Sequence, residues 1–250
     1  MRFITLGTSH GDPTPERFCS SNILEVDNNL YMIDSGAPVD ALYIKKFGND
    51  FSKLRAVFVT HAHDDHIGGL PSLIKSIIKY AKPEQHADIF LPEDIELQLV
   101  NWLKAMHLSG FEKFITFHKV SPEFIYDDSV INVTAIPTKH IYSQTQPISF
   151  SYLITSKTKR ILCTGDLSSN FSDFPIEATE NGLDLCICEA THYRPFNAVP
   201  RLTGLSIKKM VFNHVWNDFS SEEGAKAWLD CFKNVGFPCE IAVDGQEFIL

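Results

Sequence analysis

One short stretch, Thr60 to Leu70, constrains what this chain can fold into more than any other. Its letters are THAHDDHIGGL, so three imidazoles and two carboxylates fall within six positions. The apolar run before it, residues 54–59, is rich in β-branched and aromatic side chains and too short for a typical helix, so it predicts a buried strand. At the end of a strand, residues i and i+2 point the same way, and His61 and His63 can therefore face one point in space.

The second half of this stretch, which contains Asp65 and His66, is expected to face a different point in space. Asp65 and His66 are expected to start a helix that runs on through residues 69–74, so the backbone turns and the two pairs can address two neighbouring points. Imidazole together with carboxylate suits zinc, manganese or iron and disfavours calcium, which takes oxygen ligands. The alternative is a solvated polar loop that happens to contain three histidines, but burying such a group unpaired would be costly. The stretch therefore predicts a metal site.

The order of motifs along the chain resembles the metallo-β-lactamase superfamily, whose members are mostly two-metal hydrolases. The signature His-x-His-x-Asp-His stands at 61–66, and the remaining motifs follow the superfamily's order: Asp34, His140, Asp166 and His214, each at or just after an expected strand. The resemblance covers nearly the whole chain. It implies an α+β fold, the four-layer αββα sandwich, with residues 1–250 forming a single domain of this type.

The same resemblance implies how the ligands are divided. His61, His63 and His140 hold one metal, Asp65, His66 and His214 hold the second, and Asp166 bridges the two. Two such cations would lower the pKa of a shared water to about 7, which would supply hydroxide at neutral pH to attack the substrate. The cations also stabilise the negative charge that develops in the transition state. Zinc is the default for both ions, with manganese and iron as alternatives.

Three further roles concern side chains around these ligands. Asp65 is expected to steer the attacking hydroxide in addition to binding metal, and Asp34 to orient a metal-bound histidine or its neighbouring backbone. The leaving group needs a proton, and His192, just past an expected strand, is the nearest remaining candidate, with a packing or surface role as the equal alternative. In the loop after the first strand, His10 or Arg17 could contact an anionic substrate. A turn with surface side chains explains His10 equally well and Arg17 somewhat better.

Short motifs indicate which branch of the superfamily the chain resembles. Leu6-Gly7-Thr8, Leu70-Pro71, Glu189-Ala190-Thr191 and Asp244-Gly245 resemble the ribonuclease Z-like phosphodiesterases. Ribonuclease Z itself carries a histidine before Glu-Ala-Thr, where this chain has Cys188, and a long basic arm between the motifs that contain His140 and Asp166. The β-lactamases proper use cysteine where this chain has Asp166. We expect a small phosphodiester, such as a cyclic phosphate, as substrate; the alternatives are a thioester or lactone, ribonuclease Z-type RNA processing, and a non-catalytic metal-bound sensor.

Composition limits the partners of the chain. Its formal net charge of −9 over 250 residues argues against a broad nucleic-acid-binding face. The basic runs at 157–160 and 208–209 are the only candidates for a local basic rim, and a solvated turn or strand edge explains each of them better. The N-terminus resembles a strand rather than a signal peptide, and no run approaches the ~18 apolar residues that span a bilayer. The six cysteines lack zinc-ribbon spacing and lie mostly in apolar strands, as reduced cysteines do. We expect a cytoplasmic location and no membrane partner; whether the chain forms a homodimer stays open.

Periodicity predicts the remaining elements. Helices are expected at 65–80, at 92–108 with Leu97, Val100 and Leu103 on one face, and at 222–235. Hairpins are expected across 27–29, across 156–159 and, at the end of the chain, across Asp244-Gly245.

Overall fold

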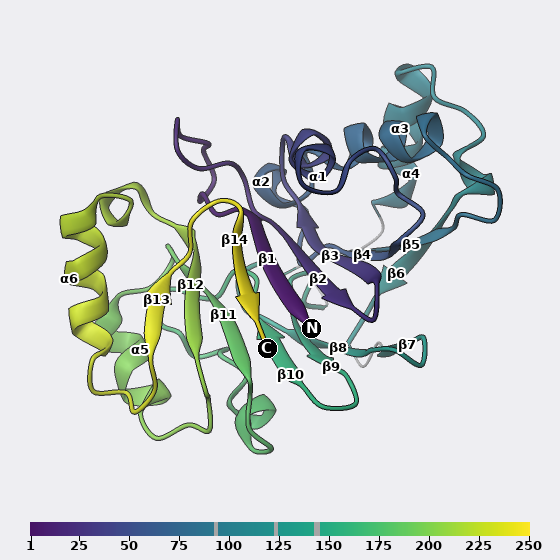
Figure 1. The fold of residues 1–250 in the computed structure, drawn as a ribbon. Helices are drawn as coiled ribbons and strands as arrows, with labels where there is room; N and C mark the ends of the chain where they lie inside the picture. Colours follow the sequence, from purple (N-terminus) through teal and green to yellow (C-terminus); the bar gives the residue numbers. More distant parts are fainter. Residues whose placement is uncertain (93–94, 123–124, 143–145) are drawn as a thin grey trace. The chain divides into compact units, whose positions relative to one another are not determined.

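The computed structural model describes residues 1–92, 95–122, 125–142 and 146–250. Within these ranges it contains two mixed β-sheets of seven strands each, with helices accompanying both (Figure 1). Each sheet lies in one of two compact units: the first comprises residues 1–120 and 244–249, the second residues 121–243 and 250. Among the described residues, no helix is long and apolar enough to cross a membrane. The expectation of a single domain stays a prediction.

The first unit contains a sheet in the order β14-β1-β2-β3-β4-β5-β6. The strands from β14 to β3 are antiparallel, and those from β3 to β6 are parallel. Its strands are β1 Arg2–Gly7, β2 Ser21–Val26, β3 Asn29–Ser35, β4 Leu54–Phe58, β5 Ala87–Pro92, β6 Ile115–Val120 and β14 Gln246–Ile249. Its helices are α1 Val39–Phe47, α2 Asp64–Ile67, α3 Leu70–Lys79, α4 Glu96–Ala105 and the 3-10 turn η1 Phe111–Lys113.

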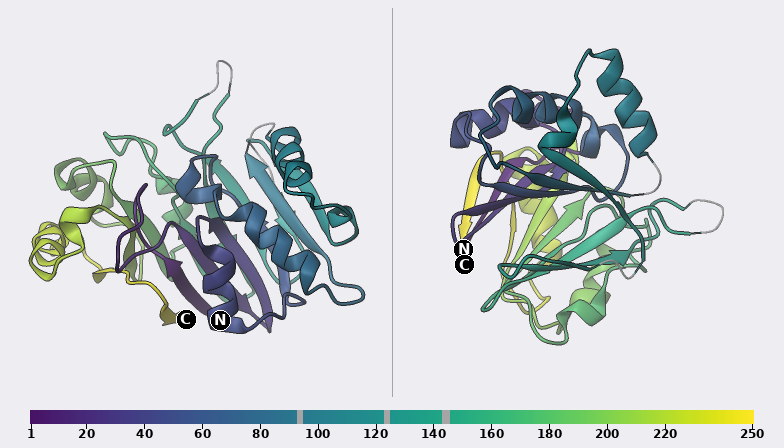
Figure 2. Two further views of the ribbon diagram at one scale, coloured as in Figure 1. Left: turned by 90° about the horizontal axis from the view of Figure 1, so that it is seen from above. Right: turned by 90° about the vertical axis from the view of Figure 1, so that its right-hand side faces the viewer.

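The helices α1 and α3 of the first unit lie along one face of its sheet (Figure 2). The helix α3 is strongly amphipathic, as the spacing of its apolar residues predicts, and it buries Leu73, Ile74 and Ile77 completely. On α1, Tyr43 is fully buried and stacks on Phe51 with ring centroids 4.4 Å apart. Burial of this one face fixes the helices on the sheet and so fixes the strand ends beside them.

The second unit contains a sheet in the order β13-β12-β11-β10-β9-β8-β7. The strands from β10 to β13 are parallel, and those from β7 to β10 are antiparallel. Its strands are β7 Ile125–Asp127, β8 Asn132–Pro137, β9 Phe150–Thr155, β10 Arg160–Cys163, β11 Leu185–Ala190, β12 Met210–Val215 and β13 Cys239–Ile241. Its helices are α5 Pro195–Leu202 and α6 Glu222–Phe232, with 3-10 turns η2 Ile176–Thr179 and η3 Asn217–Phe219.

The core of the second unit is aromatic. Trp228 and Phe232 of α6 are buried and pack on Phe212 of β12, with the Trp228 and Phe212 rings edge-to-face at 5.5 Å. Ser221 caps α6 by accepting a hydrogen bond from the Gly224 backbone N–H. The packing and the cap together hold α6 against the parallel part of the sheet.

Three local predictions are wrong. The expected final hairpin does not form, because β13 belongs to the second sheet and β14 pairs with β1 in the first. The expected helix at 65–80 is two helices, α2 and α3, interrupted at Gly68-Gly69. The expected apolar face of α4 is also wrong, because the buried residues are Leu99 and Leu103, whereas Leu97 is 64% exposed. The expected start of this helix, at residues 93–94, lies outside the described residues.

The other two hairpins are confirmed. β2 pairs with β3 across Asp27 and Asn28, which both have positive φ, as a two-residue turn of this kind requires. β9 pairs with β10 across residues 156–159.

Candidate metal centre

In the first unit, Asp34 stands at the end of β3 and joins two parts of the histidine motif. Its Oδ1 accepts hydrogen bonds from the Thr60 backbone N–H (2.7 Å) and hydroxyl (2.9 Å), and its Oδ2 accepts one from Nδ1 of His66 (2.8 Å). An ionised carboxylate only accepts, so Nδ1 of His66 carries a proton, and in the neutral ring Nε2 is the atom with a lone pair. Asp34 thus contacts both a histidine and the backbone next to the motif, as expected, and the binding of a metal by that histidine stays a prediction.

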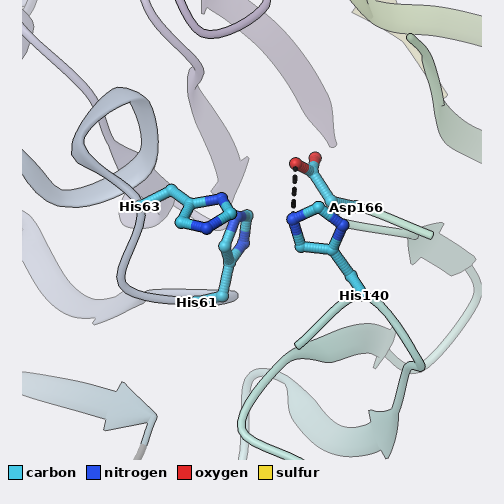
Figure 3. Close-up of side chains that lie close together, drawn as sticks. All are labelled: His61, His63, His140 and Asp166. Atoms are coloured by element: carbon cyan, nitrogen blue, oxygen red, sulfur yellow. Dashed lines mark hydrogen bonds and ion pairs between the residues drawn. The ribbon is translucent and has the colours of Figure 1, made fainter. Parts of the chain in front are cut away.

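The four motif side chains form two donor pairs. His61 Nε2 lies 3.0 Å from His63 Nδ1, and His66 Nε2 lies 3.4 Å from Asp65 Oδ2. His61 and His66 are fully buried or nearly so, and Asp65 is also buried. Figure 3 shows the rings of His61 and His63 turned toward each other. Lone-pair atoms approach this closely only when a proton or a cation lies between them.

Two glycines allow the backbone around these pairs to pack closely. A Cβ on Gly36 would lie 2.0 Å from the Asp65 carbonyl oxygen, and a Cβ on Gly69 would lie 2.7 Å from the Ser35 carbonyl oxygen. The Gly69 N–H donates to that same Ser35 carbonyl at 2.8 Å. The end of β3 can therefore approach α2 at Asp65 and the start of α3 at Gly69 this closely only because both glycines lack side chains.

In the second unit, Asp166 follows β10 and faces two imidazoles with different oxygens. Its Oδ2 lies 3.5 Å from His140 Nε2, the contact drawn in Figure 3, and its Oδ1 lies 3.7 Å from His214 Nε2. The Asp166 side chain is only 2% exposed. A carboxylate whose oxygens point to separate imidazoles has the orientation needed to bridge two cations.

A β-bulge aims His214. In the pairing of β11 with β12, Glu189 is opposite Asn213 and Ala190 is opposite Val215, so His214 is the extra residue. Its φ is +51°, and that of Asp34 in the other unit is +61°. Non-glycine residues rarely adopt this conformation, and such strained positions concentrate at functional sites.

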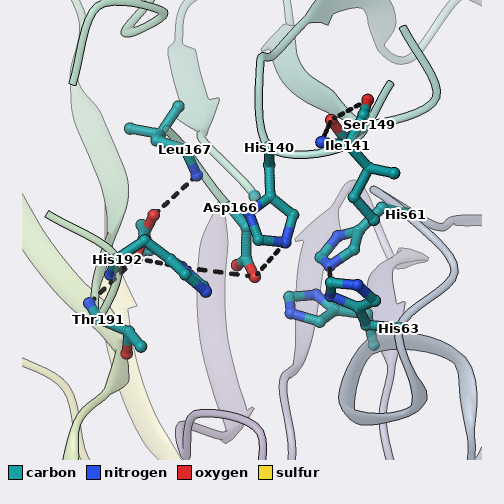
Figure 4. A network of polar contacts seen from close by, with 12 residues as sticks. His61, His63, His140, Ile141, Ser149, Asp166, Leu167, Thr191 and His192 are labelled. Carbon is teal, nitrogen blue, oxygen red and sulfur yellow. Dashed lines mark hydrogen bonds and ion pairs between the residues drawn. The ribbon is translucent and has the colours of Figure 1, made fainter. Parts of the chain in front are cut away.

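His192 lies beside Asp166 and is held by Glu189, a residue that the sequence analysis named as part of a motif but gave no role in the site. His192 Nδ1 lies 2.9 Å from Glu189 Oε2 and 3.7 Å from Asp166 Oδ2, and the network is drawn in Figure 4. Glu189 is buried and also accepts from the backbone N–H groups of Leu167, Thr191 and His192. Glu189 is three residues before His192, and a carboxylate at that distance from a candidate proton donor is the signal that would have identified it.

Asp173 joins the two loops that carry His140 and Asp166. Its carboxylate accepts hydrogen bonds from the Lys139 backbone N–H at 2.5 Å and from the Ser168 backbone N–H at 3.0 Å. Each donor is within two residues of a candidate ligand. Asp173 therefore restricts the distance between the two loops.

His10 and Arg17 are both buried in the first unit. Arg17 NH1 donates to the Thr8 hydroxyl at 2.6 Å, and that hydroxyl donates to Asp244 Oδ1 at 2.6 Å. Burial lowers the pKa of Arg17, while the Asp244 carboxylate opposes that shift. These contacts give Arg17 a bracing role between the loop after β1 and the residues before β14.

The donor sets of both units fit divalent transition metals. The first unit offers three imidazoles and a carboxylate, and the second brings Asp166, His192 and His214 within 4.8 Å of one another. Imidazole with a few carboxylates is the ligand mixture that zinc, manganese and iron accept. Of the predicted ligands, the structure brings His61, His63, Asp65 and His66 together in one unit and His140, Asp166 and His214 in the other.

Comparison with known proteins settles the family. Residues 1–194 match the sequence profile of the Anti-Pycsar protein Apyc1 family. The chain belongs to this Apyc1 family. As an Apyc1-family member it is also 30% identical over 159 residues to a ribonuclease Z of Nitrosopumilus maritimus, an alignment covering 64% of this chain and 50% of that protein. The chain thus aligns with about half the length of that relative.

Solved structures show which fold this Apyc1-family chain has. The metallo-β-lactamase fold protein YhfI of Bacillus subtilis matches with a TM-score of 0.80 at 18% identity, covering 99% of both chains. Yeast PDE1 matches with a TM-score of 0.74 at 14% identity, covering 100% of this chain and 99% of that one. The predicted fold class and the predicted ribonuclease Z-like branch of the metallo-β-lactamase superfamily are both confirmed.

Proposed function

We propose that this chain is a two-metal hydrolase that cleaves a small phosphodiester, such as a cyclic phosphate. The observation that carries the proposal is the orientation of Asp166, whose two oxygens face His140 and His214 separately. The paired donors at 61–66 support it, because each pair has the composition of half of a metal site. Membership of a hydrolase superfamily with phosphodiesterase and ribonuclease Z neighbours is consistent with this reaction.

The proposed ligand assignment follows the superfamily. His61, His63 and His140 hold one ion, Asp65, His66 and His214 hold the other, and Asp166 contributes to both. When bound, two divalent ions, zinc by preference, supply Lewis acidity and lower the pKa of water. Asp34 keeps the His66 Nδ1 protonated, so Nε2 is the atom that this residue offers.

His192 is the proposed proton donor. Glu189 holds the proton on Nδ1 of its ring, so Nε2 is the atom that exchanges a proton with the substrate. The Glu189 carboxylate stabilises the protonated ring, and the backbone N–H groups that it accepts from keep it in place. Asp65, beside His66, is proposed to orient the attacking group in addition to binding metal.

A small substrate is favoured over a long RNA by charge. The chain has a formal net charge of −9, which disfavours binding of a long, negatively charged phosphate backbone. The likeness to ribonuclease Z makes RNA processing the second candidate function. Cleavage of an RNA of transfer-RNA size would distinguish it from the small-phosphodiester proposal.

The test is hydrolysis of bis(p-nitrophenyl) phosphate by protein reconstituted with zinc or with manganese, against a chelated sample. We expect turnover that depends on metal, followed in a substrate screen by faster cleavage of cyclic phosphates than of short RNAs. Absence of turnover with either metal, combined with hydrolysis of a thioester or lactone, would replace the phosphodiesterase proposal. Absence of any hydrolysis would favour the metal-bound sensor.

The proton-donor role predicts a dependence on the leaving group. Glu189→Gln is expected to lower kcat about 10- to 100-fold for a phosphodiester with an alkoxide leaving group, because His192 loses the carboxylate that stabilises its protonated form. The same variant should change kcat for p-nitrophenyl esters little, since p-nitrophenolate leaves without a proton. Glu177→Gln, in the turn η2, is the matched control. Equal losses on both substrates would instead indicate that Glu189 is structural.

A further inference from the structure

A basic hollow lies in the second unit at the edge of the sheet where β10 and β11 begin. It measures about 440 Å³ and is lined by residues 155–160, 181–184 and 208. The two basic runs of the sequence, 157–160 and 208–209, therefore contribute to one place, although they lie far apart in the chain. Lys208 lines the hollow, whereas Lys209 pairs with Glu240 at 2.7 Å.

Two of the lysine ammonium groups lie close to the same oxygen atom of Asp184. Its Oδ1 lies 2.8 Å from the Lys208 ammonium and 3.3 Å from the Lys159 ammonium. Burial disfavours ionisation of Asp184, but hydrogen bonds from Lys208, the Arg160 backbone N–H and Lys159 outweigh burial and lower its pKa. One carboxylate charge thus holds two like charges close together, an arrangement that a bound anion would stabilise.

Arg160 adds another positive charge, and among the described residues no acidic side chain pairs with its guanidinium. Its Nε donates to the Gly182 carbonyl at 3.1 Å and its NH2 to the Ala178 carbonyl at 3.2 Å. Carbonyl oxygens hold the group in place but leave its positive charge uncompensated. With Lys157, which lines the hollow from an exposed position, the lining residues carry four cations and one carboxylate.

The wall of the hollow also has ordered hydrogen-bonding groups. The turn between β9 and β10 is fixed by Ser156, whose N–H donates to the Lys159 carbonyl and whose hydroxyl accepts from the Lys159 N–H. Thr158 and Asn181 add a hydroxyl and an amide to the lining. Cations combined with such neutral donors are what proteins use to bind phosphate groups.

We propose that this hollow binds a small phosphate-bearing molecule, at a site separate from the candidate metal ligands. The separation follows from strand direction, because β10, β11 and β12 are parallel. Arg160, Asp184 and Lys208 stand at or before the starts of these strands, and Asp166, His192 and His214 stand at or beyond the other ends.

The size and charge of the hollow favour a small ligand over a nucleic acid. Its volume lies in the range of sites for small molecules, which is roughly 300–1,000 Å³. An RNA would need a track of cations that continues beyond the hollow, and the chain as a whole is acidic. The proposal does not depend on the hydrolase proposal, since none of its residues is a candidate ligand.

The test is titration of the metal-loaded protein with inorganic phosphate and with adenosine 5′-monophosphate, measured by calorimetry. The double variant K157A/K208A should bind the preferred probe at this site about tenfold more weakly or worse, because it loses two charge-assisted contacts. K226A/K233A removes two exposed lysines of the same unit from α6 and its C-terminus and should bind as wild type does. His63→Ala, which removes a candidate metal ligand, should leave this binding site intact.

Four results decide the matter. Loss of one binding site in K157A/K208A but not in K226A/K233A or His63→Ala supports the proposal. Unchanged binding in K157A/K208A, or no binding of either probe to wild type, overturns it. Binding of a 20-nucleotide RNA but of neither small probe also overturns it and would assign the hollow to nucleic acid. The charge reversal Lys157→Glu is a second variant that keeps Lys208 and Asp184 paired and should weaken binding too.

Discussion

Replacing Asp166 by asparagine is expected to reduce kcat about 10³-fold or more and to lower the content of both bound metals. Asparagine keeps the shape of the side chain but removes the negative charge, and its amide nitrogen donates instead of accepting. A loss of 10³ corresponds to about 4 kcal/mol of transition-state stabilisation, within what a metal site supplies. Because Asp166 faces His140 with one oxygen and His214 with the other, its loss affects both halves of the ligand set.

The measurement combines metal content by mass spectrometry with steady-state kinetics on the same sample. Asp230→Asn is the matched control, since Asp230 is an exposed carboxylate on α6 of the same unit and should retain wild-type activity and metal. Circular dichroism should show that Asp166→Asn folds, because asparagine fits the same buried space. An Asp166→Asn protein with at least a tenth of wild-type kcat and full metal content would contradict the bridging role.

The parts of the site that could be predicted from sequence are those in which neighbours in the chain are also neighbours in space. His61 and His63 are two residues apart in the short segment between the end of β4 at Phe58 and the start of α2, so their closeness in space follows from their closeness in the chain. The amphipathic α3 follows from the spacing of its apolar residues. Asp34, at the end of another strand, needed the superfamily's order of motifs, because nothing local connects it with His66.

The parts that could not be predicted depend on contacts between segments distant in sequence. The spacing of Glu189 from His192 only hints at its role, because the Leu167 N–H, which also bonds to its carboxylate, is 22 residues away in the chain. The final hairpin failed because Asp244, at the expected turn, instead binds the Thr8 hydroxyl and the Phe18 N–H, and the chain continues into the other sheet. Local turn chemistry at Asp244-Gly245 is the same for a hairpin and for such a crossing.

The sequence analysis did not predict two of the helices, α1 and α5, and the reasons differ. The helix α1 is only nine residues long, and its apolar face is correspondingly short: it buries Val39 and Tyr43, with Leu42 and Phe47 partly buried against the same core. The helix α5 contains Pro200 in its interior, which removes a backbone donor and argues against a helix. In both cases the buried contacts of the folded unit outweigh weak local preferences.

His63→Ala is expected to abolish activity and to lower the bound metal from two ions toward one. His63 faces His61 at 3.0 Å, and the proposed assignment places it on one ion only, with Asp65, His66 and His214 left to hold the other. Alanine removes one of three imidazoles from that ion, and a two-metal reaction stops when one ion is absent. This pattern differs from that of Asp166→Asn, which should weaken retention of both ions.

The control for this variant is His86→Ala. His86 is an exposed histidine of the same unit that bonds to Thr116, so its removal tests for a general effect of losing an imidazole. Metal content and kcat should stay at wild-type values in His86→Ala. Full activity with two bound ions in His63→Ala would show that His63 is not a metal ligand. It would also contradict the proposal that the motif at 61–66 binds metal. One retained ion without turnover would instead separate the two metal positions and show that each is needed for the reaction.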